Sequence, residues 1–210
     1  DPDTSLLHQL GPLIQQFPDL EPGIVHLVPF LLSTRSPGVF VGFLERDRDA
    51  LPVLMRILSL PTPAASWLLE DEDCFDWLRL SAGKIASSEQ LRDVIATEVL
   101  SIEDEEVRLA SMRSYRRRET LRVLCAHFLH GMPWYDVQQQ LTCIAEAAFY
   151  SSWLLAISEM RGGGERREKV EDGLLAIAGG GFGGFEMDFE SPLSIQFLSA
   201  DEFSADTRGA

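Results

Sequence analysis

Cysteine is scarce in this sequence, and the three that occur, Cys74, Cys125 and Cys143, lie far apart. Their number and spacing exclude a disulfide framework and a zinc-finger site, so a reducing cytoplasm is the expected location. No apolar run approaches about 18 residues, which excludes a membrane-spanning helix. The first residues, Asp1–Thr4, lack the basic and apolar segments of a secretory signal, so none is expected.

Basic residues are also few relative to acidic ones. The chain has 18 Lys and Arg against 33 Asp and Glu, a net charge of −15. This balance excludes a protein built mainly to neutralise phosphates, so neither nucleic acid nor a membrane is an expected partner. Hydrophobic residues (45%) and charged residues (24%) are near the globular average, and 210 residues allow one compact domain, or one domain plus part of another.

Proline recurs throughout the first 65 residues and predicts a series of short helices there, because proline either closes a helix or occupies its first turn. Thr62 and Pro63 have the pattern of a cap and first residue for one of these helices. Further along, Ser87 and Gln90 have the spacing of a capping box, in which each side chain bonds to the other residue's backbone amide. This pair predicts a helix start.

Two long helices are predicted next, on either side of Gly131–Pro133. The first begins near Ser101 and Asp104, and the second begins at Pro133. The residues expected on the inner face of the first helix are Val107, Ala110, Ser114, Leu121, Leu124, Cys125 and Phe128. Those expected on the inner face of the second are Val137, Leu141, Ile144, Ala145, Ala148 and Leu155. Each helix has about 27 residues and a length of about 40 Å, and so short a connection predicts antiparallel neighbours.

Strand signals follow a stretch rich in glycine and charge. Gly173–Ala178 is typical of a short buried strand, and five of the next six residues are glycine. Apolar residues alternate with acidic ones over Phe185–Glu190 and with polar ones over Leu193–Phe197, and such alternation predicts further strand segments. Because a sheet of two or three strands is marginal alone, this region is predicted to be part of an incomplete second domain.

The predicted fold class is therefore mainly α. A helical region containing the long antiparallel hairpin occupies residues 1–161. A flexible charged linker follows at 162–172, and a strand–glycine loop–strand segment occupies 173–210.

The glycine loop is the one feature with the form of an enzymatic site. Glycines allow backbone N–H groups to approach a phosphate closely. A flexible turn that binds nothing explains the same composition. The spacing fits neither the Walker pattern nor a glycine motif that opens a helix, so the residues alone leave both alternatives open.

A cluster of arginines on the first long helix is the second feature. A functional interpretation is docking onto a phosphate or an acidic partner surface. The alternative is pairing with acidic neighbours such as the run Glu103–Glu106, which would brace the helical core. The residues of the cluster are Arg113, Arg116, Arg117, Arg118 and Arg122.

Residues of the metal-binding and nucleophilic types are few. His127 and His130 lie three apart on one helix, but no cysteine or carboxylate stands at a matching position beside them. Cys125 and Cys143 fit small core residues better than nucleophiles. No catalytic or metal-ligating residue is therefore assigned in this chain.

The order of features along the chain resembles a known family. The stretch Ser114–Val123, the helical pair that follows it, and the strand, glycine loop and Glu186 together resemble bacterial glutamine synthetase adenylyltransferase, the bifunctional enzyme that attaches AMP to glutamine synthetase and removes it. Upstream, Leu54–Leu58 and Trp67–Leu78 resemble the helical region that precedes its nucleotidyltransferase core. The resemblance covers about residues 25–200.

The resemblance implies that residues 173–210 hold the first strands of an α+β nucleotidyltransferase core. Family members carry two similar halves, one adding and one removing the adenylyl group, and this chain is more similar to the removing half. Intact relatives use ATP and Mg²⁺. The implied partners are glutamine synthetase and a nitrogen-regulatory signalling protein, and the implied setting is the bacterial cytoplasm.

The family motif matches this chain only in part. The lysine of the motif corresponds to Gly181 and its arginine to Phe185. The two aspartates that hold the metal ions correspond to Pro192 and Ser194, neither of which can act as an anionic ligand. The matching residues are Gly180, Gly183, Gly184, Glu186, Met187 and Ser191. The resemblance assigns nucleotide binding to Gly180, Gly183, Gly184 and Glu186.

Two other carboxylates lie close to the missing pair. On a strand, Asp188 and Glu190 would share a face with Glu186 and could replace the absent ligands, although their position would displace the metal from the glycine loop. The alternative is that they are exposed edge charges. We therefore predict a fragment or degenerate copy of the adenylyltransferase with impaired catalysis. The other hypotheses are a non-catalytic interaction module of the same ancestry, and a helical scaffold with a disordered tail.

Overall fold

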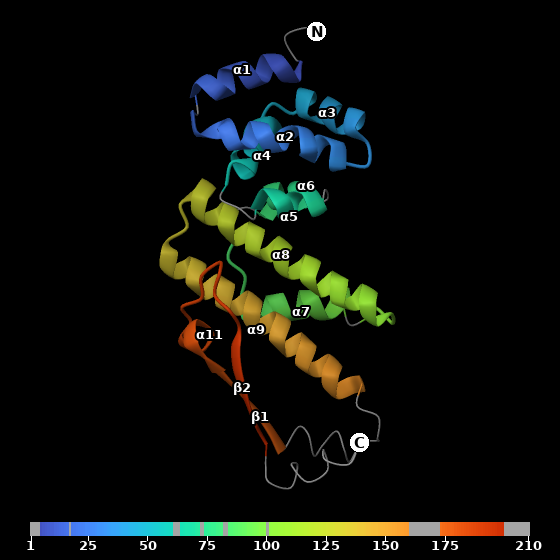
Figure 1. Cartoon of the computed structure of the whole chain (residues 1–210), viewed down its shortest axis with the longest axis vertical. Coiled ribbons are helices and arrows are strands. Elements are labelled where there is room, and N and C mark those ends of the chain that lie inside the picture. Colours follow the sequence, from blue (N-terminus) through green and yellow to red (C-terminus); the bar gives the residue numbers. More distant parts are fainter. Residues whose placement is uncertain are drawn as a thin grey trace. The chain divides into compact units, whose positions relative to one another are not determined.

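The computed structural model describes residues 5–16, 18–60, 64–71, 74–81, 84–99, 101–159 and 173–199 (Figure 1). These residues are mainly helical, with one two-stranded antiparallel sheet near the C-terminal end, which confirms the predicted fold class. The chain divides into two compact units: Asp1–Lys84 with Leu121–Met132, and Ile85–Thr120 with Pro133–Ala210. The linker proposed at 162–172 and the cap at Thr62 and Pro63 lie outside the described residues, and the predicted domain boundaries stay predictions.

The first unit contains the short helices predicted from the prolines. Its core includes three fully buried or half-buried rings, Phe30, Phe40 and Phe75, which contact one another edge to face. Pro12 lies inside a continuous helix, so the expectation that each proline closes a helix or occupies its first turn is wrong at this residue. The elements are α1 (Leu6–Gln16), η2 (Pro18–Leu20), α2 (Glu21–Ser33), α3 (Pro37–Arg46), α4 (Ala50–Leu58), α5 (Ala64–Glu70) and α6 (Cys74–Ser81).

Arg79 on α6 connects this core to α3. Its guanidinium lies over the rings of Phe43 and Phe75, 5.4 and 5.8 Å from their centroids, and forms an ion pair of 2.6 Å with Asp47. The guanidinium holds the pKa of the Asp47 carboxyl below its ordinary value, through a side-chain hydrogen bond. A cation stacked on aromatic rings thus joins two short helices.

The second unit is built on α7 (Ser88–Val99) and α9 (Trp134–Glu159), which pack closely against each other. The capping box at the start of α7 is confirmed: the Ser87 N–H donates to Gln90 Oε1 at 3.0 Å, and the Gln90 N–H donates to Ser87 Oγ at 3.2 Å. Gln140 on α9 bonds to both backbone groups of Ala86. These bonds fix the entry of α7 against α9.

The helix α8 (Glu105–His130) runs from the second unit into the first. Asp104 caps it by accepting a bond from the Val107 N–H, and Gly131 ends it with a left-handed φ of 71°. Both ends were predicted, and α8 and α9 each have 26 residues. In the second unit, the first part of α8 and α9 run in opposite directions (Figure 1).

The inner face expected for α8 is wrong at both ends. Val107, Ala110 and Phe128 are exposed. The buried residues of the first part are Met112, Tyr115, Glu119 and Thr120, whereas every residue from Leu121 to Ala126 is buried. A single helical stripe cannot describe a helix whose buried surface changes along its length.

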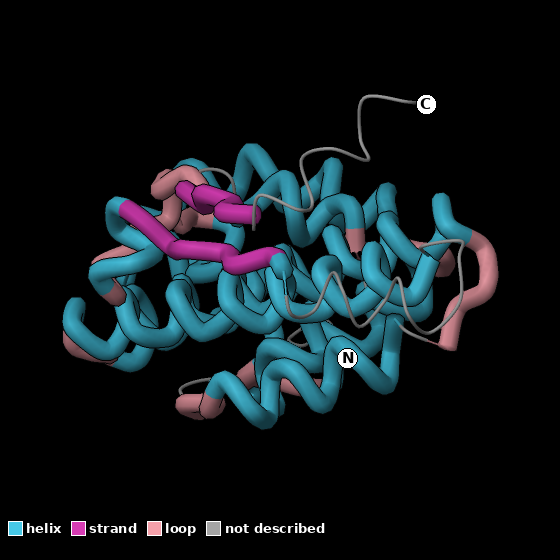
Figure 2. Tube along the Cα trace, turned by 90° about the horizontal axis from the view of Figure 1, so that it is seen from below, coloured by secondary structure: helices cyan, strands magenta, loops and turns pink. Residues whose placement is uncertain are grey.

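The sheet consists of β1 (Leu174–Gly179) and β2 (Ser194–Ser199), which lie side by side in Figures 1 and 2. Both strands were predicted, but β1 is half-exposed and not buried. The strand predicted over Phe185–Glu190 is wrong, because these residues form turns and irregular backbone. Their apolar side chains pack elsewhere: Met187 is buried, and the Phe189 ring meets the Trp134 ring edge to face.

Aromatic contacts attach the sheet to α9. The Phe197 ring of β2 stacks on the Trp153 ring with their centroids 5.9 Å apart and the planes nearly parallel, and it also contacts Phe149. Phe149 and Trp153 thus form the apolar surface of α9 against which Phe197 of the sheet packs. A two-stranded sheet that is marginal by itself gains a helical support in this way.

Candidate functional site: a glycine turn between two strands

The glycine loop forms a short helical turn, α11 (Gly180–Gly184), between β1 and β2. Gly180 has a left-handed φ of 58°, a conformation that favours glycine. A Cβ at Gly183 would clash with the backbone carbonyl of Ala178, lying 2.8 Å from its carbon. Two glycines of the predicted nucleotide-binding set are thus required by the shape of the turn, whatever it binds.

The outer side of the turn is open. Gly183, Gly184 and Glu186 are all exposed. The Glu186 N–H donates to the Gly181 carbonyl at 2.8 Å, and the Glu186 carboxylate lies 3.8 Å from the place of a Cβ on Gly184. Phe185, between them, has a left-handed φ of 58° that the sequence analysis did not predict. The four residues of the predicted set therefore lie together.

Ser194 lies next to this turn. It pairs with Gly179 across the sheet, and its Oγ is 3.4 Å from the place of a Cβ on Gly179. Its Cβ is 3.8 Å from the corresponding place on Gly180. The position to which the resemblance assigns the second aspartate is therefore beside the glycine turn, and this chain carries an exposed hydroxyl there. Pro192, at the first aspartate position, is also exposed.

Asp188 stabilises the turn before β2. Its Oδ1 accepts bonds from the Ser191 hydroxyl at 2.8 Å and the Glu190 N–H at 2.9 Å. The Ser191 hydroxyl is the main cause that lowers the pKa of the Asp188 carboxyl, which is therefore ionised at neutral pH. Since this segment is not a strand, Asp188 and Glu190 do not share the strand face that a replacement metal site required. The Asp188–Ser191 spacing is typical of a polar turn and could have indicated this role.

The residues beside the glycine turn do not fit a magnesium ion. A pair of carboxylates is the expected ligand set for a metal that bridges nucleotide phosphates, but proline and serine occupy both positions. Asp188 Oδ1, in the segment between the turn and β2, already accepts two hydrogen bonds. Among the described residues, no three His, Cys, Asp or Glu side chains gather in a way that could hold a metal.

The arginine cluster divides into two kinds of residue. Arg118 makes a two-pronged ion pair with Glu98 of α7, at 2.8 and 3.0 Å, and Arg122 is buried and donates to the Lys84 carbonyl. These two brace the structure. Arg113 and Arg116 are exposed, while Arg117 is half-buried and has an interaction of its own.

The residues considered as possible metal ligands or nucleophiles contribute to the structure instead. The His127 ring lies with its Nδ1 2.7 Å from the Met132 carbonyl, which connects the end of α8 to the loop that follows. Cys125 is buried, and burial raises the pKa of its thiol to about 12. Such a thiol is a poor nucleophile at neutral pH.

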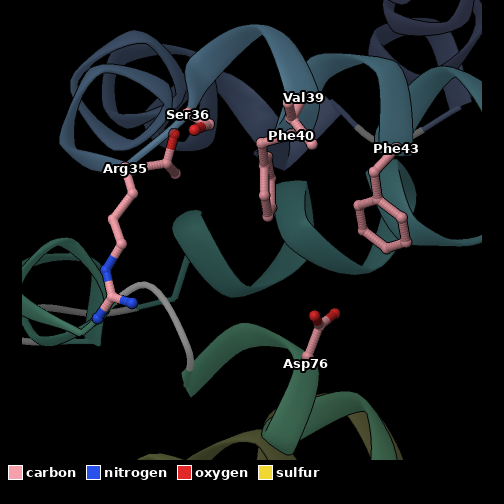
Figure 3. A pocket seen from close by; sticks show the side chains of 7 residues that line it. Arg35, Ser36, Val39, Phe40, Phe43 and Asp76 are labelled. Atoms are coloured by element: carbon pink, nitrogen blue, oxygen red, sulfur yellow. The ribbon is translucent and has the colours of Figure 1, made fainter.

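A pocket of about 290 Å³ lies in the first unit, outside the predicted site. Figure 3 shows the rings of Phe40 and Phe43 on one side of it, facing the carboxylate of Asp76, with Arg35 and Ser36 at its end. No residue that the sequence analysis selected lines this pocket. We assign it no role.

The sequence model of one family, glutamate-ammonia ligase adenylyltransferase, matches residues 53–209. The chain belongs to this family. The match begins within α4 and covers the glycine turn, both strands and the arginine helix, and it confirms the resemblance drawn from the sequence. The family name states the reaction: transfer of an adenylyl group to glutamate–ammonia ligase, which is glutamine synthetase. None of the described helices is long and apolar enough to cross a membrane.

Proposed function

We propose that this chain is an adenylyltransferase segment that keeps the backbone of the nucleotide site but has impaired catalysis. The observation that carries the proposal is the position of Ser194. It lies directly beside the glycine turn, at the position where the family motif has a metal-binding aspartate. A hydroxyl there cannot neutralise the charge that develops on a transferred phosphoryl group.

The nucleotide-facing groups are those of the turn. The exposed side of the turn, where Gly183 and Gly184 lie, faces the phosphates, Gly180 gives the turn its shape, and Glu186 orients it. Intact relatives supply charge neutralisation with Mg²⁺. In this chain the ion lacks its ligands, so binding depends on backbone dipoles alone and is weak.

A second candidate function is a non-catalytic module whose helices bind glutamine synthetase or a nitrogen-regulatory signalling protein. The observation that favours it is the exposure of Arg113 and Arg116 on a helix otherwise braced by Arg118. The bacterial cytoplasm is the setting that the resemblance implies for both functions, and three free thiols are compatible with a reducing compartment.

The test is ATP binding with and without Mg²⁺, followed by hydrogen exchange of the β1 and β2 amides. The unchanged chain is expected to show no Mg²⁺-dependent protection. The double variant Pro192→Asp with Ser194→Asp is expected to gain it, because two carboxylates then lie beside the turn. The matched control keeps Pro192→Asp but moves the second carboxylate to Gln196→Asp, on the same face of β2 but two residues farther from the turn.

Each result decides between the alternatives. Mg²⁺-dependent binding in the double variant alone supports the proposal. Mg²⁺-dependent binding in the unchanged chain shows that catalysis is not impaired at this point. Equal behaviour of the double variant and its control shows that the glycine turn is not the nucleotide site, and the interaction module is then favoured.

A further inference from the structure

The first part of α8 has an exposed face on which charges are separated by sign. Glu103 lies in the irregular backbone that precedes α8. Glu106, Ala110 and Arg113, on the helix, follow one another at spacings of four and three residues and therefore lie along one side of it. Arg116 comes three residues later. All five residues are exposed. We call them the α8 seam.

Apolar side chains flank this seam without cover. Val107 is 55% exposed and Leu109 is 41% exposed. The opposite side of the same helix carries the buried residues Met112 and Tyr115, and the Tyr115 hydroxyl donates to the Leu91 carbonyl of α7 at 3.0 Å. The seam is thus the outer side of a helix whose inner side is already packed, and it lies wholly in the second unit.

The charges of the seam cannot neutralise one another within one helix. Ion pairs along a helix join residues three or four apart, but Glu106 and Arg113 are seven apart, or about 10 Å along the axis. The guanidinium groups of Arg113 and Arg116 make no hydrogen bond or ion pair with any residue that the structure describes. Both the acidic end and the basic end of the seam can therefore be neutralised by opposite charges on a second molecule.

We propose that two copies of this chain pair through the α8 seam, antiparallel, with a two-fold axis at Ala110. Glu103 and Glu106 lie seven and four residues before Ala110, and Arg113 and Arg116 lie three and six residues after it. In an antiparallel pair, Glu106 of one copy therefore faces Arg113 of the other to within about one residue rise, 1.5 Å, and Glu103, just before the helix, comes near the level of Arg116. A two-fold interface requires such self-complementarity.

The centre of the seam suits a close approach. Ala110 has the smallest side chain on the helix face and would meet Ala110 of the second copy, while Val107 and Leu109 lose their exposure to water. The contact spans about 14 residues, or about 20 Å of helix. So small an interface lies below the size of stable complexes, and much of its attraction is screened by salt. We expect a weak dimer with a dissociation constant of about 10–100 μM at low salt.

Sedimentation of the full chain tests this pairing. Self-association is expected over the range from about 1 to about 500 μM, and it should weaken at least tenfold between about 0.05 M and about 0.5 M salt. A monomer at every concentration in low salt overturns the proposal. Binding of the arginines to an acidic partner protein would not rescue it. This inference does not depend on the proposed nucleotide site, because no residue of the glycine turn enters it.

Charge reversal identifies the seam. The basic-end variant, Arg113→Glu with Arg116→Glu, and the acidic-end variant, Glu103→Arg with Glu106→Arg, should each lose dimerisation by about tenfold or more, because like charges then face each other. An equimolar mixture should recover it, since each end of one variant then faces the opposite charge on the other. Loss without recovery in the mixture, when both variants keep their helix content, contradicts the antiparallel pairing.

Two matched controls complete the design. Arg46→Glu with Arg48→Glu makes the same change of charge at exposed positions of the first unit and should leave association unchanged. Ala110→Cys should form a disulfide-linked dimer on mild oxidation, because the residue meets its own copy at the two-fold axis. Ala156→Cys, an exposed position on α9, should not. Equal cross-linking of the two variants refutes an axis at Ala110.

Discussion

The backbone geometry of the glycine turn predicts different effects for alanine substitutions at two adjacent residues, Gly183 and Gly184. A Cβ on Gly183 would clash with the Ala178 carbonyl of β1, whereas a Cβ on Gly184 would meet only the Glu186 side chain at an ordinary 3.8 Å. Neither glycine has a left-handed φ, so alanine can adopt the backbone conformation at both positions. The two alanine substitutions therefore differ only in the space available for the added methyl group.

The expected difference follows from packing energies. Alanine gains about 1 kcal/mol over glycine in a helical turn at either position, and this gain cancels in the comparison. Forcing an extra methyl against fixed backbone costs about 1–3 kcal/mol. Gly183→Ala should thus open the strand pair about 5- to 160-fold more often than Gly184→Ala does.

Hydrogen exchange of the β1 and β2 amides measures this opening directly. Protection should fall in Gly183→Ala and stay unchanged or rise in Gly184→Ala, while the amides of α7 serve as an internal reference. Equal protection of the strands in the two variants would refute the claim that Gly183 is required by the close approach of β1. The glycine would then be explained better by a ligand.

Two further predictions concern single side chains. Cys125 is buried and the pKa of its thiol is raised to about 12, so it should resist alkylation in the native protein at pH 8, whereas half-exposed Cys143 reacts. Mass spectrometry measures both alkylation rates. Equal rates would contradict the burial of Cys125. Asp188 has a lowered pKa in the folded state, so its stabilisation of the turn is present above the ordinary carboxyl pKa and is lost as the pH falls through the lowered value. Exchange of the Glu190 amide should therefore lose protection below about pH 4, and Asp188→Asn should show the smaller protection without that pH dependence.

Helix ends were predictable from the sequence because they depend on short-range bonds. The capping pair Ser87 and Gln90, the cap Asp104 and the terminator Gly131 all act within four residues of the chain. The buried face of α8 was not predictable in the same way. Its burial depends on which neighbours it meets along its length, and this is not encoded in a period of 3.6 residues.

The sequence predicted that the glycines and Glu186 lie together but not the geometry of their turn, and nucleotide binding by these residues stays a prediction. The glycines and Glu186 lie together as the motif implied, and Ser194 lies beside them. The alternation over Phe185–Glu190 predicted a strand, because alternation records which side chains are apolar and not what they pack against. Here Met187 is buried under the turn and Phe189 meets Trp134, so the same pattern supports a compact turn.

Proline and serine at positions 192 and 194, where the resemblance implies metal-binding aspartates, do not disturb the fold. Pro192 precedes the first residue of β2, so its missing N–H removes no bond from the sheet. Ser194 is exposed, and no buried group depends on its side chain. What holds the strands in place is instead the glycine backbone and the stacking of Phe197 on Trp153. Folding and charge neutralisation therefore depend on different residues, and a chain can keep the first after losing the second. Family membership shows the scaffold of this segment, whereas its capacity for metal-assisted charge neutralisation must be argued from the residues at positions 192 and 194.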